Sequence, residues 1–379
     1  MERGLFSEEH MIFRDAYLKF LDKEVAPYYE QWEKDGIVPK SVWRKLGENG
    51  FLCPWVDEKY GGVGAGFEYS VVMTEEGARR GYSGVASGLH SNIIVPYIDS
   101  YGTEEQKEKW LPGCVTGEII TAIAMTEPGA GSDLAALRTT AIKDGDDYII
   151  NGQKTFISNG INSNLVIVAA RTDPAAGYKG ISLIVVEEGT PGFSRGRNLE
   201  KMGMHSQDTA ELSYEDCRVP QSNLLGAEGK GFYYLMKKLE RERLISVMGS
   251  QAMAEAMLEM TIQYCKERQI FGKPVSAFQH NTFKIVEMAT EIELGRVFVD
   301  AMIKDHISGI DITKRVCMAK AWISEMVNRV AGRCVQLHGG YGYCEEYPIC
   351  RFFRDVRVHT IFAGSTEVMN SIVAKMMGI

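Results

Sequence analysis

The sequence lacks several features that would indicate a membrane or nucleic-acid function. Its 379 residues contain no apolar run approaching the ~20 residues of a transmembrane helix and no long cluster of lysine and arginine. The net charge of -8 and the absence of a basic cluster argue against nucleic acid or an anionic membrane as the main partner. The opening MERGLFSEEH has neither the apolar core of a signal peptide nor the arginines of a transit sequence. We therefore expect no signal peptide and no membrane span, in a protein that is cytoplasmic if bacterial or resembles a mature mitochondrial-matrix protein.

Cysteine and histidine are not arranged as in a metal site. The 8 cysteines include no CxxC pair, and Cys334, Cys344 and Cys350 lack the close spacing of zinc ligands. We expect no metal and no disulfide framework, and most cysteines to be small buried hydrophobes. No second ligand stands at metal spacing from His338 or His359, so both are expected to pack or to form hydrogen bonds.

Two glycine-rich segments do not form a dinucleotide fingerprint. Neither GGVGAG at 61–66 nor QLHGGYG at 336–342 has the required spacing or lies between a strand and a helix, so a Rossmann fold is excluded. The paired glycines at 339–340 could let a ligand approach the backbone closely, or could form only a tight turn between helices.

The order of secondary-structure signals predicts three domains. Residues 1–118 show helical spacing with Thr103 and Gln106 as a capping box, and 119–228 contain short β-branched runs separated by turns. Residues 229–379 return to helices, expected at 231–268, 279–307, 313–337 and after 365. Asn151-Gly152 predicts a hairpin turn. The fold class is therefore α+β and multidomain: an N-terminal α-helical domain, a central β-barrel or sandwich domain, and a C-terminal helical bundle.

An acid on the helix expected at 231–268 has unusual neighbours. At about 100° per residue, Glu242 falls on one stripe with two leucines, which would raise the pKa of its carboxyl toward a range suited to proton transfer. However, the surrounding KKLERER is also typical of an ordinary salt-bridged surface helix. The residues on the stripe are Leu235, Leu239, Glu242, Ser246 and Gly249.

Three other segments can bind a ligand or serve only as structure. MTEPGAGSD at 125–133 follows a strand and offers backbone N–H groups and hydroxyls, which suits a flavin or a phosphate, but an ordinary turn has the same composition. On the next expected strand, alternation places Phe156 and Ser158 on one side. RQIFGKP at 268–274 ends a helix with an arginine that could bind a pyrophosphate or simply favour the helix terminus.

Taken together, motifs along nearly the whole chain resemble the acyl-CoA dehydrogenase family. They are MTEPGAGSD, NGQKTFISNG, KMGMHSQDTAELSYEDCRVP, KERQIFGKP, QLHGGYGYCEEYP and IFAGSTEV, and several are most similar to the long-chain branch. The resemblance implies the three domains above with a four-helix C-terminal bundle, one FAD per subunit and a homotetramer built as a dimer of dimers. It also implies an acyl-CoA substrate and electron-transferring flavoprotein as the electron acceptor.

The resemblance also assigns the catalytic base. Where most family members carry a glutamate in the C-terminal motif, this chain has Ala363, which cannot accept a proton. In the long-chain and isovaleryl branches the base is the glutamate of a Glu-Arg-Leu sequence, which corresponds here to Glu242. Glu242 would remove the α-proton while the β-hydrogen leaves as hydride to the flavin, giving a trans-2-enoyl-CoA. The backbone N–H of Ala363 and a hydroxyl of FAD would hold the thioester oxygen.

The remaining site residues are carried over position by position from the family motifs. Phe156 and Ser365 depart from the commonest residues at their positions, so contacts there are less defined than the fold. The cofactor-binding residues would be Met125, Thr126, Ser132, Phe156, Ile157, Ser158, Ser365 and Glu367, joined by Arg268, Phe271, Gln279, Gln336, Gly339 and Gly340 from a neighbouring subunit. The substrate-binding residues would be Ser132, Tyr233, Glu240, Arg241, Arg243, Ala363 and Gly364.

Several related functions remain open at this stage. A medium or long straight-chain substrate is favoured, but the position of the base is shared with dehydrogenases of branched or cyclic acyl-CoAs such as isovaleryl-CoA. An acyl-CoA oxidase is disfavoured, since such oxidases usually carry an extra C-terminal helical domain. A non-catalytic flavin- or CoA-binding partner is disfavoured by the presence of Glu242.

Overall fold

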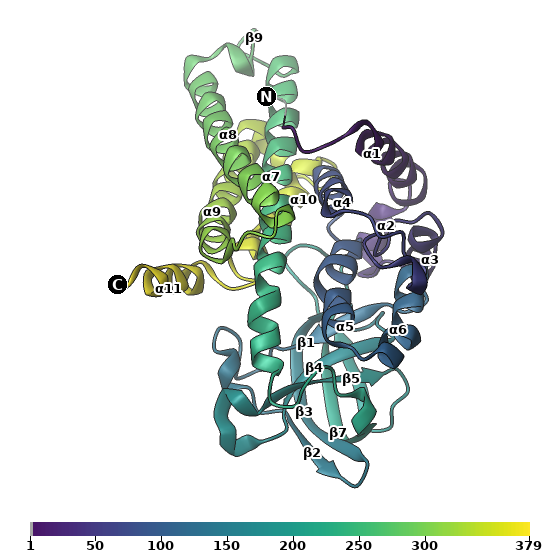
Figure 1. Ribbon diagram of the computed structural model, residues 1–379. Helices are drawn as coiled ribbons and strands as arrows, with labels where there is room; N and C mark the ends of the chain where they lie inside the picture. The colour runs from purple at the N-terminus through teal and green to yellow at the C-terminus, as the bar shows by residue number, and fades with distance from the viewer. Residues whose placement is uncertain (1–2) are drawn as a thin grey trace.

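The computed structural model describes residues 3–379 and has a helical N-terminal part, a central sheet and a helical C-terminal part (Figure 1). Thr103 and Gln106 form the predicted capping box, in which the Thr103 N–H donates to Gln106 Oε1 over 3.0 Å. The N-terminal helices are α1 (Glu8–Phe20), α2 (Tyr29–Asp35), α3 (Lys40–Glu48), α4 (Phe67–Arg79), α5 (Val95–Tyr101) and α6 (Glu104–Thr116).

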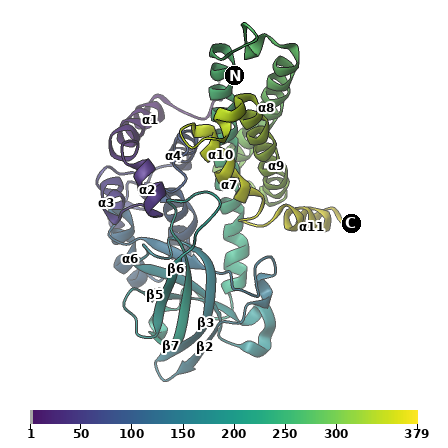
Figure 2. The same ribbon diagram turned by 180° about the vertical axis from the view of Figure 1, so that it is seen from behind.

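The central part is one seven-stranded sheet with strand order β1-β4-β2-β3-β7-β6, in which β5 also pairs with β4. Figure 2 shows β3 beside β7, which pairs on its other edge with β6, and both pairings of β7 are antiparallel. An apolar cluster on one face of the sheet includes Val166, Val168 and Leu212, each at 0% exposure. The strands are β1 (Thr121–Ala124), β2 (Thr140–Asp144), β3 (Asp147–Ser158), β4 (Leu165–Arg171), β5 (Ile181–Glu187), β6 (Phe193–Asn198) and β7 (Thr209–Pro220).

The hairpin predicted at Asn151-Gly152 is wrong, because both residues lie inside β3. The turn that joins β2 to β3 is centred on Gly145, which has a φ of 61°. Gly152 instead occupies an irregularity in the pairing of β3 with β7, and a Cβ there would lie 2.4 Å from Thr139 Oγ1. Glycine is therefore required at this position for close packing between strands, which the dipeptide signal cannot distinguish from a turn.

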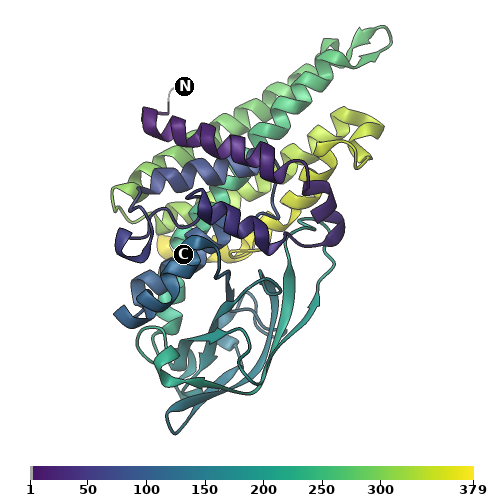
Figure 3. The same ribbon diagram turned by 90° about the vertical axis from the view of Figure 1, so that its right-hand side faces the viewer.

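The C-terminal part is built around three long helices, as the sequence predicted, and Figure 3 shows α7 and α8 extending past the rest of the molecule. Methionines and valines such as Val247, Met257 and Val327 fill the space between them at 0% exposure. No helix within residues 3–379 combines the length and apolarity needed to cross a bilayer. The elements are α7 (Gly231–Glu267), β8 (Gln269–Ile270), β9 (Lys273–Pro274), α8 (Gln279–Ile307), α9 (Thr313–His338), α10 (Pro348–Val356) and α11 (Thr366–Met377).

The three-part α+β architecture is thus confirmed, and the short helix α10 is the one C-terminal helix that the periodicity did not predict. Its nine residues bury Ile349 and Phe352 against the long helices, which is too short a repeat to stand out in the sequence. Most cysteines are buried as expected, namely six of the eight. His338 and His359 are also buried and hydrogen-bonded, to Cys334 O and Ser250 Oγ.

Candidate active site

Glu242 lies in an apolar setting on α7. Leu235 and Leu239, two turns and one turn before it, are 0% and 6% exposed. The Glu242 side chain is half-buried, and its Oε2 atom is fully buried with no hydrogen-bond partner within residues 3–379. Burial raises the pKa of Glu242 to about 7, against the opposing fields of Arg243 and Lys320. Such a carboxyl can take up a proton near neutral pH, as a general base must.

The neighbours of Glu242 on α7 are held by protein contacts. Glu240 accepts a hydrogen bond from Thr313 Oγ1 over 2.7 Å, and Arg241 donates to Asn92 Oδ1 over 3.1 Å. The Arg241 guanidinium also lies 5.0 Å from the centre of the Phe67 ring, and desolvation lowers its pKa to about 10. Tyr233, which lies two turns before Glu240 on α7, is 46% exposed.

The loop that follows α10 brings Ala363 next to α7. Ala363 has a φ of 52° and Gly364 a φ of 97°, so both adopt the left-handed backbone region. Arg243, which is 6% exposed, points its Nε at Ala363 O over 3.4 Å. Within residues 3–379 the N–H of Ala363 donates to no acceptor. An unpaired N–H in a fixed turn is a donor available to a ligand oxygen.

Lys320 contacts the same loop, and the sequence interpretation missed it. Its ammonium donates to His359 O over 2.6 Å and to Gly364 O over 3.0 Å, and the side chain is 0% exposed. Its position could have been recognised, because Lys320 stands among apolar residues on the inward face of α9, where a charge is unexpected.

The β-domain segments predicted to bind a cofactor lie side by side. The Thr155 N–H donates to Thr126 O over 2.9 Å, which joins the 125–133 turn to β3. Phe156 has a φ of 57° and is 67% exposed, in a second irregularity of the β3–β7 pairing. Ile157 is buried and Ser158 half-buried, while Met125 and Thr126 are half-buried and Ser132 is exposed.

This surface fits a flavin. An exposed aromatic ring held in a strained backbone conformation persists only where the surroundings fix it, and such strain clusters at ligand sites. Phe156 offers a flat apolar face, and Thr126 and Ser158 offer hydroxyls beside it. These are the group types that hold a planar heterocycle with polar edges.

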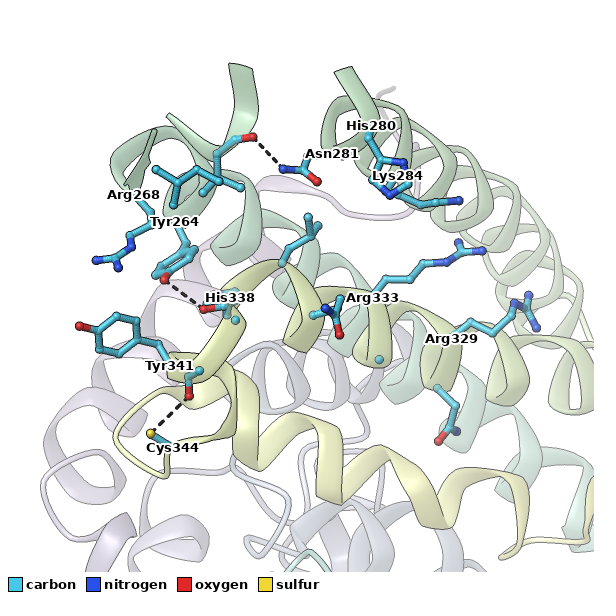
Figure 4. A pocket seen from close by; sticks show the side chains of 18 residues that line it. Tyr264, Arg268, His280, Asn281, Lys284, Arg329, Arg333, His338, Tyr341 and Cys344 are labelled. Atoms are coloured by element: carbon cyan, nitrogen blue, oxygen red, sulfur yellow. Dashed lines mark hydrogen bonds between the residues drawn. The ribbon is translucent and has the colours of Figure 1, made fainter. Parts of the chain in front are cut away.

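The other predicted cofactor residues lie at the opposite end of α7. A groove of about 1200 Å³ opens there, and four of these residues line it: Arg268, Gln336, Gly339 and Gly340 (Figure 4). The Arg268 guanidinium lies 5.2 Å from the centre of the Tyr341 ring and forms no ion pair within residues 3–379. Phe271 is 93% exposed between β8 and β9, and Gln279 is exposed at the start of α8.

Ser365 and Glu367 form a third location at the start of α11. Both line a smaller pocket of about 390 Å³ with Arg357 and Thr360. The Ser365 hydroxyl accepts from the Val368 N–H over 3.3 Å and so caps α11.

The turn at Met125 and the groove at Arg268 are far apart within one chain, whereas the pocket at Ser365 borders that groove, since Asn328 lines both. The 37 residues of α7 span about 55 Å at 1.5 Å per residue, and the β8–β9 hairpin lies at the end of the molecule opposite the sheet (Figure 1). The groove at Arg268 and the turn at Met125 therefore cannot contact the same cofactor from a single chain.

Comparisons with known proteins agree with these features. The N-terminal, middle and C-terminal domain models of acyl-CoA dehydrogenase match residues 7–118, 122–217 and 229–378. The chain is 47% identical to the rat long-chain specific acyl-CoA dehydrogenase over 377 residues, which cover 99% of this chain and 88% of that protein. It is 35% identical to potato isovaleryl-CoA dehydrogenase over 98% of this chain and 91% of that protein. The crystal structure of an acyl-CoA dehydrogenase from Geobacillus kaustophilus superposes with a TM-score of 0.98 at 60% identity, with 99% of each chain covered. The chain therefore belongs to the acyl-CoA dehydrogenase family, whose members are FAD-dependent flavoproteins.

Proposed function

We propose that Glu242 is the base that removes the α-proton of an acyl-CoA thioester. The observation that carries this proposal is the buried Oε2 atom of Glu242, which has no hydrogen-bond partner within residues 3–379 and shares a helix face with Leu235 and Leu239. A carboxylate that is not already hydrogen-bonded can accept a proton without first breaking another contact. With a pKa of about 7, the Glu242 carboxyl is ionised in roughly half of the molecules at neutral pH. The raised pKa also makes the ionised carboxylate a stronger base than an ordinary glutamate.

The Ala363 N–H would hold the thioester oxygen. The α-proton of a thioester is only weakly acidic, so charge that develops on the oxygen as the proton leaves must be stabilised. The N–H has no acceptor within residues 3–379, and the loop that carries it is fixed to α7 and α9. FAD would supply the acceptor for the hydride that leaves the β-carbon.

Apolar side chains around Glu242 would exclude water from the proton transfer. Leu235 and Leu239 precede it on α7, and Tyr97 on α5 is buried close enough for Glu242 to contribute to its raised pKa. A low-dielectric surrounding strengthens the interaction of the N–H with the developing negative charge. Tyr233, Glu240, Arg241, Arg243 and Gly364 are proposed to border the substrate path, directly or through the loop they support.

Cofactor binding is proposed to need two copies of the chain. Met125, Thr126, Ser132, Phe156, Ile157 and Ser158 would contact one end of the cofactor. Arg268, Phe271, Gln279, Gln336, Gly339 and Gly340 of a second copy would contact the other, and Ser365 and Glu367 would complete the site. The two groups of residues lie near opposite ends of α7, which supports this division. A homotetramer built as a dimer of dimers would supply the second copy of the chain. We place the three domains at 1–118, 119–228 and 229–379.

The proposed substrate is a medium or long straight-chain acyl-CoA. The identity of 47% to a long-chain enzyme, against 35% to an isovaleryl-CoA enzyme, supports this order. Initial rates with palmitoyl-, octanoyl- and isovaleryl-CoA test it, and a strong preference for isovaleryl-CoA would reject the straight-chain proposal. The proposed electron acceptor is electron-transferring flavoprotein, and rapid reoxidation of the reduced enzyme by air alone would indicate an oxidase instead.

Glu242→Gln tests the base directly. The variant should retain FAD but reduce it at least ~10²–10⁴ times more slowly when acyl-CoA is added, as measured by loss of flavin absorbance in a stopped-flow instrument. Glu259→Gln is a matched control, since Glu259 is exposed on the same helix. Equal rates of flavin reduction in the two variants would reject Glu242 as the base.

A further inference from the structure

The loop between α10 and α11 is fastened by a buried lysine. Lys320 on α9 donates to His359 O over 2.6 Å and to Gly364 O over 3.0 Å, so its ammonium joins two carbonyls that flank Ala363. His359 is fixed a second time, because its Nδ1 lies 2.6 Å from Ser250 Oγ on α7. The backbone from 359 to 364 is therefore held at both ends.

A second buried cation contacts the middle of this loop. Arg243 on α7 directs its Nε at Ala363 O over 3.4 Å, and its Nη1 lies 3.4 Å from Cys317 Sγ on α9. In the part of the chain that the structure describes, neither Lys320 nor Arg243 has a carboxylate oxygen within 4.0 Å. Burying a cation without a direct ion pair is unfavourable, so two such cations on one short loop call for an explanation beyond packing.

The segment they hold is strained. Ala363 has a φ of 52°, a region that residues other than glycine seldom adopt, and its N–H has no acceptor within residues 3–379. Next to it, Gly364 has a φ of 97°, a conformation in which any other residue would be strained. A strained residue of this kind persists only when its surroundings determine its conformation.

We propose that Lys320 and Arg243 are positioning residues that hold the Ala363 peptide in its left-handed conformation and so present its N–H to the thioester oxygen. This inference rests on the proposed function, in which Glu242 is the base and the Ala363 N–H is the donor. It assigns to Lys320 a role in the reaction that acts through the loop to which it donates.

The same two cations act on the base. Burial raises the pKa of Glu242, and the fields of Arg243 and Lys320 lower it. Loss of the Lys320 charge therefore raises the pKa of Glu242 further, and a higher pH is then needed to ionise the carboxyl. A lysine that served only as packing for α9 would have no such effect on the pH dependence.

The test compares Lys320→Met with the wild-type holoenzyme and with Ser324→Ala. Ser324 is buried one turn further along α9, and its hydroxyl bonds within its own helix to Lys320 O, so this control disturbs the same core without touching the loop. In Lys320→Met we expect kcat to fall about 10- to 100-fold, less than for outright loss of an oxyanion donor. The rising limb of the kcat/KM–pH profile should move to higher pH. Ser324→Ala should match the wild type in both.

The carbonyl stretching frequency of bound enoyl-CoA reports the donor without turnover. In the wild type, hydrogen bonding should lower this frequency relative to free enoyl-CoA, and in Lys320→Met it should move back toward the free value. Adding Ala363→Gly to Lys320→Met should restore part of kcat, because glycine adopts a φ near 50° without strain. If Lys320→Met does not accumulate as folded holoenzyme, Lys320→Gln replaces it, since its amide can still donate to one carbonyl.

The outcomes separate this inference from the proposed function. If Glu242→Gln remains active, the base assignment fails whatever Lys320 does. If Glu242→Gln is inactive while Lys320→Met keeps the wild-type kcat, carbonyl frequency and pH profile, the base assignment stands and the positioning role is overturned.

Discussion

The Lys154 ammonium donates to the Glu127 carboxylate over 2.8 Å beneath the 125–133 turn, and the two side chains are 0% and 6% exposed. Lys154 also donates to Met125 O over 3.2 Å, so one buried cation ties the turn to β3. Lys154→Met would leave Glu127 buried without its partner, which typically costs about 3 kcal/mol or more. We expect that loss in the free energy of unfolding in urea, together with faster release of FAD on dilution.

A double variant serves as the control for this pair. Lys154→Met combined with Glu127→Gln leaves no unpaired charge. The glutamine oxygen can still accept the Thr139 N–H that now bonds to Glu127 over 2.9 Å, but the Arg138 N–H, which donates to the other Glu127 oxygen, loses its acceptor. The double variant should therefore recover part of the stability lost in Lys154→Met. Equal losses in the single and double variants would show that packing, and not the charge pair, stabilises the turn.

Catalysis should depend on pH through Glu242. The carboxyl must be ionised to accept a proton, and burial raises its pKa to about 7. The value of kcat/KM should therefore rise about tenfold per pH unit below that pKa and level off above it. Steady-state rates between pH 5.5 and 8.5 at constant ionic strength measure this, and a profile flat from pH 5.5 upward would contradict a base with a raised pKa.

Keeping this acid buried should also reduce stability. The pKa of Glu242 rises from 4.5 when unfolded to about 7 when folded, so the folded state loses stability as pH rises through this window. Glu242→Gln removes the titration and should raise the free energy of unfolding at pH 8 by up to about 3 kcal/mol, since each pKa unit corresponds to about 1.4 kcal/mol. This gain in stability should vanish below pH ~4.5, where the Glu242 carboxyl is protonated in both the folded and the unfolded state. Urea unfolding of the holoenzyme at pH 5 and pH 8 checks this, with Glu259→Gln as the control.

Local sequence patterns were sufficient for the elements but not for the loop geometry. The long helices appeared at the predicted positions because their apolar spacing persists over many turns, as it does around Leu235 and Leu239. The hairpin turn predicted at Asn151-Gly152 was wrong, because the same dipeptide is compatible with a turn and with an irregularity inside a strand. In both cases the local signal was real, and only tertiary contacts decided what it meant.

For the candidate site, too, the sequence could indicate single residues but not their tertiary contacts. Glu242 could be proposed as the base from its stripe and from the family resemblance around Ala363, but the contacts of that alanine could not be predicted. Lys320 lies 43 residues before Ala363, and their proximity depends on how α9 packs against the loop. A charge on an apolar helical face is visible in the sequence, whereas the carbonyls that satisfy it are not.

Phe271 should show whether a second copy completes the cofactor site. It is 93% exposed with a φ of 49° on the β8–β9 hairpin, far from the sheet of its own chain. Covering such a side chain contributes about 1.5–3 kcal/mol per copy, so Phe271→Asp should weaken both assembly and FAD retention. We expect a lower mass by light scattering and a specific activity that falls on dilution. Val63→Asp is the control, because Val63 is 63% exposed on a loop of the N-terminal part. Identical mass and FAD content in the two variants would contradict a cofactor site shared between chains.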